Sequence, residues 1–349
     1  MLPRDRIVRE IHDQGGWISF ARYMELALHA PGSGYYAGGS RQFGAEGDFV
    51  TAPELGDLFG RTLARQLAQL PDLPILELGA GSGALAETLA TGREYFILET
   101  SAPLRARQEA RLGSKAKHLD RLPERWRGIV IANEVADAMP VHLVAWRAEG
   151  VMERGVALHD EFFQWKERPA SGALQEEAIR IEVPRPYESE IGLAARAWMR
   201  TLCEHLAHGA ILVIDYGFPN GEYYHPQRST GTLMCHHRHR AHADPFARPG
   251  DEDITAHVDF SALAAAARAA GAEVLGYATQ AQFLVNCGIT EVLAEANVEN
   301  ALVYAPIAAQ AQKLLSPAEM GELFKVLAVG KGITTPLLGF TRGDRSHAL

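Results

Sequence analysis

The spacing of apolar residues predicts helices at the start of the chain. Apolar positions repeat at helical spacing over residues 7–11 and again over residues 20–28. Residues 31–53 combine many Gly and Pro residues with aromatic residues, which favours a long shaped loop, and such loops in compact domains are often functional. Residues 54–70 then carry the pattern of an amphipathic helix.

Short apolar runs alternate with helical stretches through most of the remaining chain. Strands are predicted at Ile75–Leu78, Tyr95–Leu98, Ile129–Ala132, Ile211–Ile214 and Leu337–Phe340, with an edge strand at Glu273–Tyr277. Helices are predicted at residues 83–91, 102–112, 187–208 and 259–270. This alternation is typical of an α/β fold with a parallel sheet, in which ligands bind at the carboxyl ends of the strands.

Two stretches interrupt the alternation of strands and helices. Residues 141–184 follow a strand-like pattern and are interpreted as an inserted β-ribbon, whereas residues 280–330 are interpreted as helical. The expected organisation is therefore a helical N-terminal cap with a covering loop over residues 1–70. The α/β core with its two insertions then occupies residues 71–349.

Composition and charge narrow the classes of function. A chain of 349 residues suits one large core with insertions, or two domains. The net charge of -9 repels a phosphate backbone, so nucleic-acid binding is disfavoured. No apolar run is long enough to insert into a membrane, and the first residues lack the apolar stretch of a signal peptide. The three cysteines form no CxxC pair, so a reducing, cytoplasmic location is expected.

The strongest chemical signal is the segment ILELGAGSGALAETL, residues 75–89. A predicted strand containing Glu77 runs into a glycine-rich loop and then into a helix. Glycine allows a tight turn and the close approach of a ligand. The next predicted strand ends at Glu99, twenty residues after Gly79, where a carboxylate can accept hydrogen bonds from both hydroxyls of a ribose. The residues expected to contact the ligand are Glu77 and the loop residues Gly79, Ala80, Gly81 and Gly83.

The spacing of the loop does not by itself separate two kinds of cofactor. Gly79-x-Gly81-x-x-Ala84 also fits a dinucleotide fingerprint, so NAD or FAD remains an alternative. The acid at Glu77 and the G-x-G-x-G pattern favour S-adenosylmethionine (SAM), because a pyrophosphate would have to share its pocket with a carboxylate. We therefore predict a class I methyltransferase fold that binds SAM and releases S-adenosylhomocysteine.

Two further residues complete the sheet side of the predicted cofactor site. Asp120 falls where a third strand should end and is a candidate to hold the adenine amino group. The alternative for Asp120 is a solvated acid in a loop. Ser101, two residues beyond Glu99, is also assigned to the cofactor.

Polar residues at the end of the fourth predicted strand indicate the acceptor side. In IVIANEVADAMPVH, residues 129–142, Asn133 and Glu134 lie where the strand ends, beside the glycine loop if the two strands are neighbours. Asn133 is assigned to cofactor binding. Glu134 and Asp137 are candidates to hold a cationic acceptor or to take its proton, and paired carboxylates suit the planar guanidinium fork. Alternatively, Asp137 caps a turn and Glu134 bonds to backbone.

The segment GDFVTAPE, residues 47–54, offers a third candidate catalytic acid. Thr51 and Pro53 are assigned to a loop that covers the cofactor, and Glu54 to catalysis. Glu54 stands just before a predicted helix, so its alternative role is to complement the positive end of that helix.

A histidine-rich segment, MCHHRHRAHAD at residues 234–244, invites a metal interpretation. Its histidines are His236, His237, His239 and His242. Zinc sites need tetrahedral ligands with suitable spacing, and the neighbouring arginines Arg238 and Arg240 oppose a cation. We expect no metal here.

These segments together resemble the MidA family, which includes the mitochondrial complex I assembly methyltransferase. The similarity is carried by ISFARYMELALHAPGSGYY at 18–36, GDFVTAPELGDLFG at 47–60, ELGAGSGALA at 77–86, ANEVADAMPV at 132–141, LVIDYG at 212–217, RPGDEDITAHVDF at 248–260 and MGELFKVLAVG at 320–330.

The resemblance implies a seven-stranded class I methyltransferase core with a helical N-terminal cap. It also implies that Gly79, Gly81 and Glu99 contact SAM, that residues 47–54 cover it, and that Asn133–Pro140 border the acceptor. The eukaryotic member makes symmetric dimethylarginine on a complex I subunit. This chain shows no mitochondrial presequence, so it looks like a bacterial relative.

The predicted function is a SAM-dependent methyltransferase that acts on a protein nitrogen, with arginine as the expected acceptor. The expected partners are a protein substrate, for which a complex I subunit is a candidate, and a second copy of the chain. One alternative is a SAM-binding assembly factor whose catalysis is dispensable. Another is a small-molecule methyltransferase.

Overall fold

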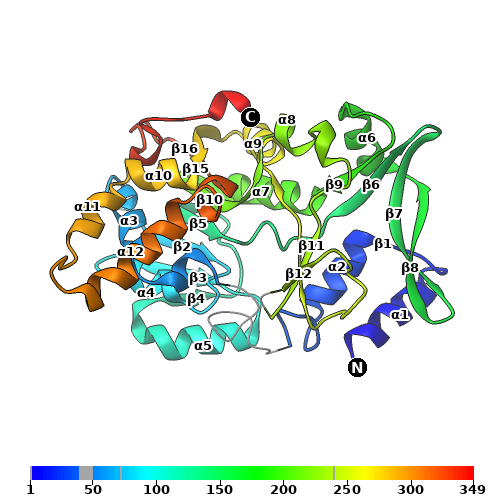
Figure 1. The fold of residues 1–349 in the computed structure, drawn as a ribbon, viewed down its shortest axis with the longest axis horizontal. Helices are drawn as coiled ribbons and strands as arrows, with labels where there is room; N and C mark the ends of the chain where they lie inside the picture. Colours follow the sequence, from blue (N-terminus) through cyan, green and yellow to red (C-terminus); the bar gives the residue numbers. More distant parts are fainter. Residues whose placement is uncertain (1, 39–49, 71–72, 239) are drawn as a thin grey trace. The chain divides into compact units, whose positions relative to one another are not determined.

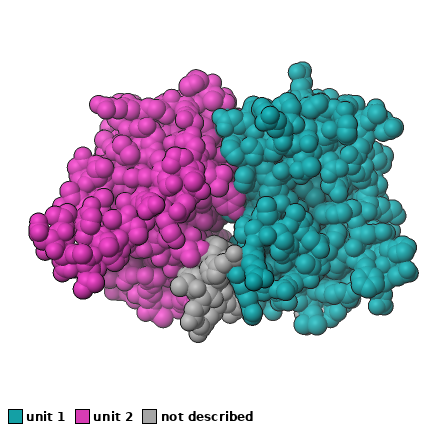
Figure 2. All heavy atoms as spheres, viewed as in Figure 1, with its two compact units in different colours: residues 1–49, 136–197, 218–259 teal, residues 50–135, 198–217, 260–349 magenta. Residues whose placement is uncertain are grey.

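The computed structural model describes residues 2–38, 50–70, 73–238 and 240–349. Part of the predicted covering loop, residues 39–49, and His239 therefore lie outside the described residues. The chain forms two compact units, coloured in Figure 2. Unit 1 comprises residues 1–49, 136–197 and 218–259, and unit 2 comprises residues 50–135, 198–217 and 260–349. Residues 50–70, which the sequence assigns to an N-terminal cap, belong to unit 2.

Unit 2 is built on a mostly parallel sheet whose strands follow the order β15-β16-β10-β5-β2-β3-β4 (Figure 1). Neighbours from β10 to β4 are parallel, and β16 runs antiparallel to both β10 and β15. The strands are β2 (Ile75–Leu78), β3 (Tyr95–Leu98), β4 (Lys117–Leu119), β5 (Trp126–Asn133), β10 (Leu206–Phe218), β15 (Glu273–Thr279) and β16 (Phe324–Lys331). The predicted seven-stranded methyltransferase-like fold is confirmed.

The helices of unit 2 connect these strands and extend the core at one end. The first set comprises η1 (Ala52–Leu55), α3 (Leu58–Leu67), α4 (Ala84–Leu89), α5 (Ala102–Leu112), η2 (Gly113–Lys115) and α9 (Phe260–Ala269). The later set comprises α10 (Gln280–Asn286), α11 (Ile289–Ala294), α12 (Ala301–Leu315), α13 (Met320–Leu323), η4 (Leu338–Phe340) and η5 (Ser346–Ala348). Helices α3, α10, α11 and α12 pack against one another.

The central strands of unit 2 are apolar because both of their faces are covered. All four residues of β2 are buried, and β5 is buried from Gly128 to Ala132. Continuous apolar runs of this kind are what a parallel sheet buried on both faces requires. The chain order changes direction between β2 and β5, and ligands bind beyond the carboxyl ends of the strands at such a switch point.

Unit 1 combines two N-terminal helices with antiparallel sheets. One sheet has the order β1-β7-β6-β9, with β8 paired to β7, and a small sheet has the order β12-β11-β13. The elements are α1 (Pro3–Asp13), β1 (Ile18–Ser19), α2 (Phe20–His29), β6 (His142–Arg147), β7 (Gly150–His159), β8 (Phe162–Pro169), α6 (Gly172–Arg180), β9 (Tyr187–Ile191), α8 (Asn220–Tyr223), η3 (Pro226–Arg228), β11 (Met234–His237), β12 (Arg240–His242) and β13 (Asp253–Thr255). The predicted N-terminal helices are confirmed. The inserted β-ribbon predicted over residues 141–184 is confirmed for β6, β7 and β8, whereas residues 172–180 of that range form helix α6.

Three sequence-based element assignments are wrong. Residues 187–191 form strand β9, and helix α7 (Leu193–His205) begins only after it. The predicted helical stretch 280–330 ends in strand β16, a buried run that includes Val326 and Val329. Leu337–Phe340, predicted as a strand, is mostly the 3-10 turn η4. Short fully apolar runs do not distinguish a buried strand from a buried helix, which explains the last two errors.

No helix among the described ranges is long and apolar enough to cross a membrane.

Candidate functional site

The glycine loop after β2 has a backbone that only glycine adopts readily. Gly79, Gly81 and Gly83 have φ values of 63°, 54° and 83°, in the left-handed region. A Cβ atom on Gly79 would lie 3.1 Å from Cγ2 of Val135, just beyond β5. The Gly79 N–H donates to the carbonyl of Leu98 at 3.1 Å, which ties the loop to the end of β3. At these three positions no side chain projects from the turn between β2 and α4.

Glu99 lies beside this loop and is joined to it by a side chain of α5. Its Oε1 accepts a hydrogen bond from the Ser101 N–H at 2.8 Å, and its Oε2 accepts one from Nε2 of Gln108 at 3.0 Å. The same Gln108 nitrogen donates to the carbonyl of Gly81 at 2.9 Å. Burial raises the pKa of Glu99. Two predicted cofactor residues, Gly81 and Glu99, are therefore brought together.

Gln108 is a site residue that sequence analysis did not identify. It is fully buried on α5, and its Oε1 lies 3.0 Å from Nε2 of His118. The sequence does contain a signal for this role, because Gln108 is a polar residue on the inner face of the helix predicted at residues 102–112. Ser101 also has a structural role, because its hydroxyl accepts from the Leu104 N–H at 3.4 Å and caps α5.

Glu77 is buried on β2 beneath the glycine loop. Its Oε2 accepts a hydrogen bond from the Tyr95 hydroxyl at 2.8 Å. Burial raises the pKa of Glu77 to about 7, and the Tyr95 hydrogen bond only partly opposes this. The predicted contact between Glu77 and the cofactor stays a prediction.

This raised pKa predicts how stability depends on pH. The folded chain holds the Glu77 proton up to about pH 7, whereas an unfolded chain releases it near 4.5. Stability should therefore fall as pH rises from 4.5 to 7, by at most about 3 kcal/mol. Glu77→Gln keeps an acceptor for Tyr95 and should lack this loss. The free energy of unfolding of both proteins is measured by urea unfolding at pH 5 and pH 8.

The matched control for this experiment is Glu94→Gln, because Glu94 is exposed and pairs with Lys117 at 3.0 Å on the surface. It should keep the pH dependence of the unmodified chain. If Glu77→Gln loses as much stability between the two pH values as the unmodified chain does, the buried carboxyl is not responsible.

The segment before α3 contacts both the glycine loop and the end of β5. Glu54, on η1, accepts a hydrogen bond from the Ser82 hydroxyl in the glycine loop. The Ala52 N–H donates to Oε1 of Glu134 at 3.3 Å. Thr51 is buried where this segment begins, and Pro53 lies within η1. Residues 51–54 therefore border the glycine loop, and their predicted role in covering the cofactor stays a prediction.

Glu134 has an unusual backbone at the carboxyl end of β5. Its φ is 54°, a left-handed value that costs a residue with a side chain on the order of 1 kcal/mol or more. Its N–H donates to the carbonyl of Ile214 at 2.9 Å, and its Oε1 accepts from Nδ2 of Asn133 at 3.1 Å. Such strained residues cluster at functional sites.

Buried Asp215 supports the turn that contains Glu134. It lies on β10, the neighbour of β5, and its Oδ2 accepts a hydrogen bond from the Val135 N–H at 3.2 Å. Its Oδ1 accepts from the Tyr216 N–H at 2.9 Å. The turn after β5 is thus held from two sides, by η1 and by β10.

Two further predicted site residues, Asp120 and Asp137, have contacts with other parts of the chain. Asp120 is exposed and forms an ion pair with Arg105 at 2.6 Å, which matches the alternative of a solvated loop acid. Asp137 is buried in unit 1, where its carbonyl accepts from the Ala256 N–H at 3.1 Å. The negative charge of Asp137 contributes to raising the pKa of Tyr36 in the same unit.

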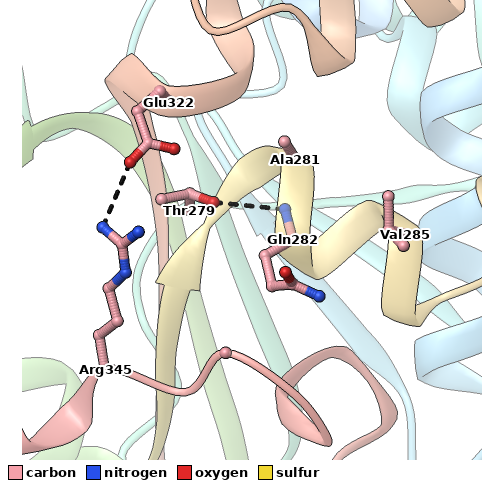
Figure 3. Close-up of a pocket in the computed structure, with 7 residues that line it drawn as sticks. Thr279, Ala281, Gln282, Val285, Glu322 and Arg345 are labelled. Atoms are coloured by element: carbon pink, nitrogen blue, oxygen red, sulfur yellow. Dashed lines mark hydrogen bonds and ion pairs between the residues drawn. The ribbon is translucent and has the colours of Figure 1, made fainter.

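A separate cavity of about 230 Å³ lies elsewhere in unit 2 (Figure 3). Arg345 and Glu322, which line the cavity, form an ion pair at 3.2 Å. Thr279, another lining residue, caps helix α10. Its lining consists of Thr279, Ala281, Gln282, Val285, Glu322, Gly343 and Arg345. It contains none of the predicted cofactor residues, so it is distinct from the glycine-loop site.

Comparison with known proteins agrees with this geometry. The family model described as "Putative S-adenosyl-L-methionine-dependent methyltransferase" matches residues 58–278. A crystal structure from Burkholderia thailandensis, bound to S-adenosyl-homocysteine, is 51% identical, with a TM-score of 0.95 over 99% of this chain and 96% of that one. A native crystal structure from the same organism is also 51% identical, with a TM-score of 0.93.

Curated relatives are more distant but also cover most of the chain. The mitochondrial protein arginine methyltransferase NDUFAF7 of Danio rerio is 29% identical over 93% of this chain and 89% of its own length. Its Drosophila melanogaster homologue is 28% identical over 93% and 86%. The similarity to the MidA family is thus confirmed, and the cofactor is SAM. The chain belongs to this family of SAM-dependent methyltransferases.

Proposed function

We propose that this methyltransferase transfers its methyl group to an arginine side chain of a protein substrate. The observation that carries the proposal is Glu134, a carboxylate held in a strained backbone at the carboxyl end of β5. It is linked through Ala52 to the segment that contacts the glycine loop. The names of the curated relatives, protein arginine methyltransferases, support the choice of acceptor.

The residues around the glycine loop fit SAM. Three glycines with left-handed backbones carry no side chains, so a ligand can approach the main chain at these positions. Glu99 is only partly buried, and a carboxylate has about four acceptor positions, so it can accept from ribose hydroxyls beside its Ser101 and Gln108 donors. SAM supplies an electrophilic methyl group. Glu99 would fix its sugar, and Gly79–Gly83 would border its amino-acid portion.

Glu134 would act on the acceptor. A guanidinium is planar and donates two parallel hydrogen bonds to a carboxylate, which would orient one nitrogen. The nitrogen must lose a proton during or after methyl transfer, and Glu134 would accept it. Glu54, which contacts the glycine loop through Ser82, is a second proposed catalytic carboxylate. Asp137 remains a proposed acceptor ligand.

We propose a complex I subunit as the protein substrate. We also propose that the enzyme acts in the cytoplasm. Mass spectrometry of methylarginine peptides in cells with and without the gene tests the arginine claim. At least one peptide should lose its methyl groups on deletion and regain them on complementation. A methylarginine profile that does not change on deletion would contradict the proposal.

Glu99→Gln should weaken binding of S-adenosylhomocysteine by about 10- to 100-fold, because charge-assisted hydrogen bonds to the ribose are replaced by weaker ones. Isothermal titration calorimetry measures the change. The control is Glu109→Gln, because Glu109 is on α5 but pairs on the surface with Arg105 at 3.1 Å. Equal affinities for Glu99→Gln and the control would exclude Glu99 as a ribose ligand.

A further inference from the structure

Three potential ligand side chains meet on one face of the small sheet in unit 1. In the register of this antiparallel sheet, Cys235 on β11 is opposite His242 on β12 and Ile254 on β13. Directly opposite residues share a face, and side chains alternate along a strand. Glu252, two residues before Ile254, is therefore on the same face as Cys235 and His242.

The distances show that these side chains form a compact group. The Sγ atom of Cys235, a ring nitrogen of His242 and a carboxylate oxygen of Glu252 all lie within 4.8 Å of one another. Nε2 of His242 is 3.0 Å from Oε2 of Glu252. Cys235 and Glu252 are fully buried, whereas 35% of the His242 side chain is exposed. Two of the three side chains are therefore buried, and the group is accessible to solvent through the imidazole of His242.

A second observation indicates that this group lacks a ligand. Oε1 of Glu252 is buried, and none of the described residues donates a hydrogen bond to it. An unsatisfied buried oxygen is costly, and native proteins rarely keep one without a reason. A bound cation would give this oxygen a partner.

We propose that Cys235, His242 and Glu252 bind a zinc ion. Thiolate, imidazole and carboxylate are the ligand types that zinc takes in proteins, and three protein ligands leave a fourth position for water. In tetrahedral geometry the ligand atoms lie about 3.3–3.7 Å apart, so side-chain movements of about 1 Å would close the site. Two anionic ligands would balance the charge of the ion in a buried setting.

The positive charges of residues 234–248 do not prevent zinc binding. Arg238 and Arg240, which disfavour a metal in the sequence, are exposed, so water and salt screen them. Arg248 contributes one positive charge near Glu252, against two negative charges on the deprotonated ligands. The histidine pattern did not reveal this group, because only His242 of the four histidines belongs to it. Cys235 is on β11, and Glu252 directly precedes β13.

Cobalt binding to the purified full chain tests the site without an activity assay. After chelator treatment, the chain is titrated with Co²⁺, which reports a thiolate ligand by a charge-transfer absorption band. We expect one cobalt ion per chain, this band, and its loss when Zn²⁺ is added. A folded chain that takes up no cobalt and shows no band would overturn the proposal.

Variants assign the ligands, and circular dichroism verifies that each is folded. Cys235→Ser should abolish the band, whereas Cys287→Ser, which changes a buried cysteine of unit 2, should keep it. His242→Asn changes a partly exposed side chain and should weaken metal binding at least tenfold. An undiminished band in folded Cys235→Ser would overturn the proposal, as would unchanged affinity in His242→Asn, which decides the matter if Cys235→Ser does not fold.

Discussion

Gly81→Val should abolish binding of SAM and of S-adenosylhomocysteine, with a loss in affinity of at least about 100-fold. Gly81 has a φ of 54°, which a β-branched residue adopts only at a cost of about 1–2 kcal/mol or more. The valine side chain would also occupy the turn that Gly79–Gly83 keep free for a ligand. Isothermal titration calorimetry with either molecule measures the loss.

Gly92→Val is the matched control for this variant. Gly92 has a φ of 75°, and a Cβ atom there meets nothing within 4 Å. The control should therefore carry a comparable backbone strain, with a similar decrease in thermal stability, and should still bind the cofactor. Our placement of the cofactor would be wrong if Gly81→Val bound S-adenosylhomocysteine as tightly as Gly92→Val does.

Glu134→Gln should lower the rate of methyl transfer by about 10²- to 10⁴-fold, the usual contribution of a positioned acid or base. The substitution keeps the shape of the side chain and an acceptor for the Ala52 N–H, but removes the negative charge. Affinity for SAM should change less than about threefold, because Glu134 is proposed to act on the acceptor. The rate is measured as transfer of labelled methyl groups to protein from a deletion strain.

Glu94→Gln, on the surface of unit 2, should retain the full rate of transfer. For Glu134, the decisive result is a lower rate of methyl transfer with unchanged affinity for SAM. If Glu134→Gln bound SAM normally and also transferred methyl groups at an unchanged rate, Glu134 would be a structural residue with no chemical role. The strained backbone would then need another explanation.

The centre of the sheet was predictable because its sequence signals are local. Strands β2, β3 and β5 are short apolar runs that end at polar or glycine residues, and each was predicted within a few residues. The glycine loop was predictable for the same reason, since left-handed turns require glycine wherever they occur. Edge strand β15 was also predicted correctly.

Elements that depend on tertiary packing were not predictable. Strand β16 is buried from Phe324 to Gly330, and its continuous apolar run Val326–Val329 has neither a helical nor an alternating pattern. Leu337–Phe340 is also an apolar run, but most of it forms a 3-10 turn, where a Cβ on Gly339 would lie 2.2 Å from the Phe283 ring. Composition alone does not separate these two cases.

The candidate site shows the same division. Glu99 was predictable from its spacing to the loop, but its link through Gln108 depends on how α5 packs against that loop. The bond between Glu54 and Ser82 joins residues 28 positions apart, which no local pattern indicates. Asp137 is close to Glu134 in sequence, yet the two residues belong to different units.

The central claim is methyl transfer from SAM to a protein arginine, and labelled transfer tests it most directly. The purified chain is incubated with SAM that carries an isotopically labelled methyl group and with lysate from the deletion strain. Modified peptides are then sequenced by mass spectrometry. We predict label on the guanidinium nitrogens of a specific arginine, absent with Glu134→Gln. Label confined to other residues or to small molecules, from a chain that binds SAM, would contradict the claim.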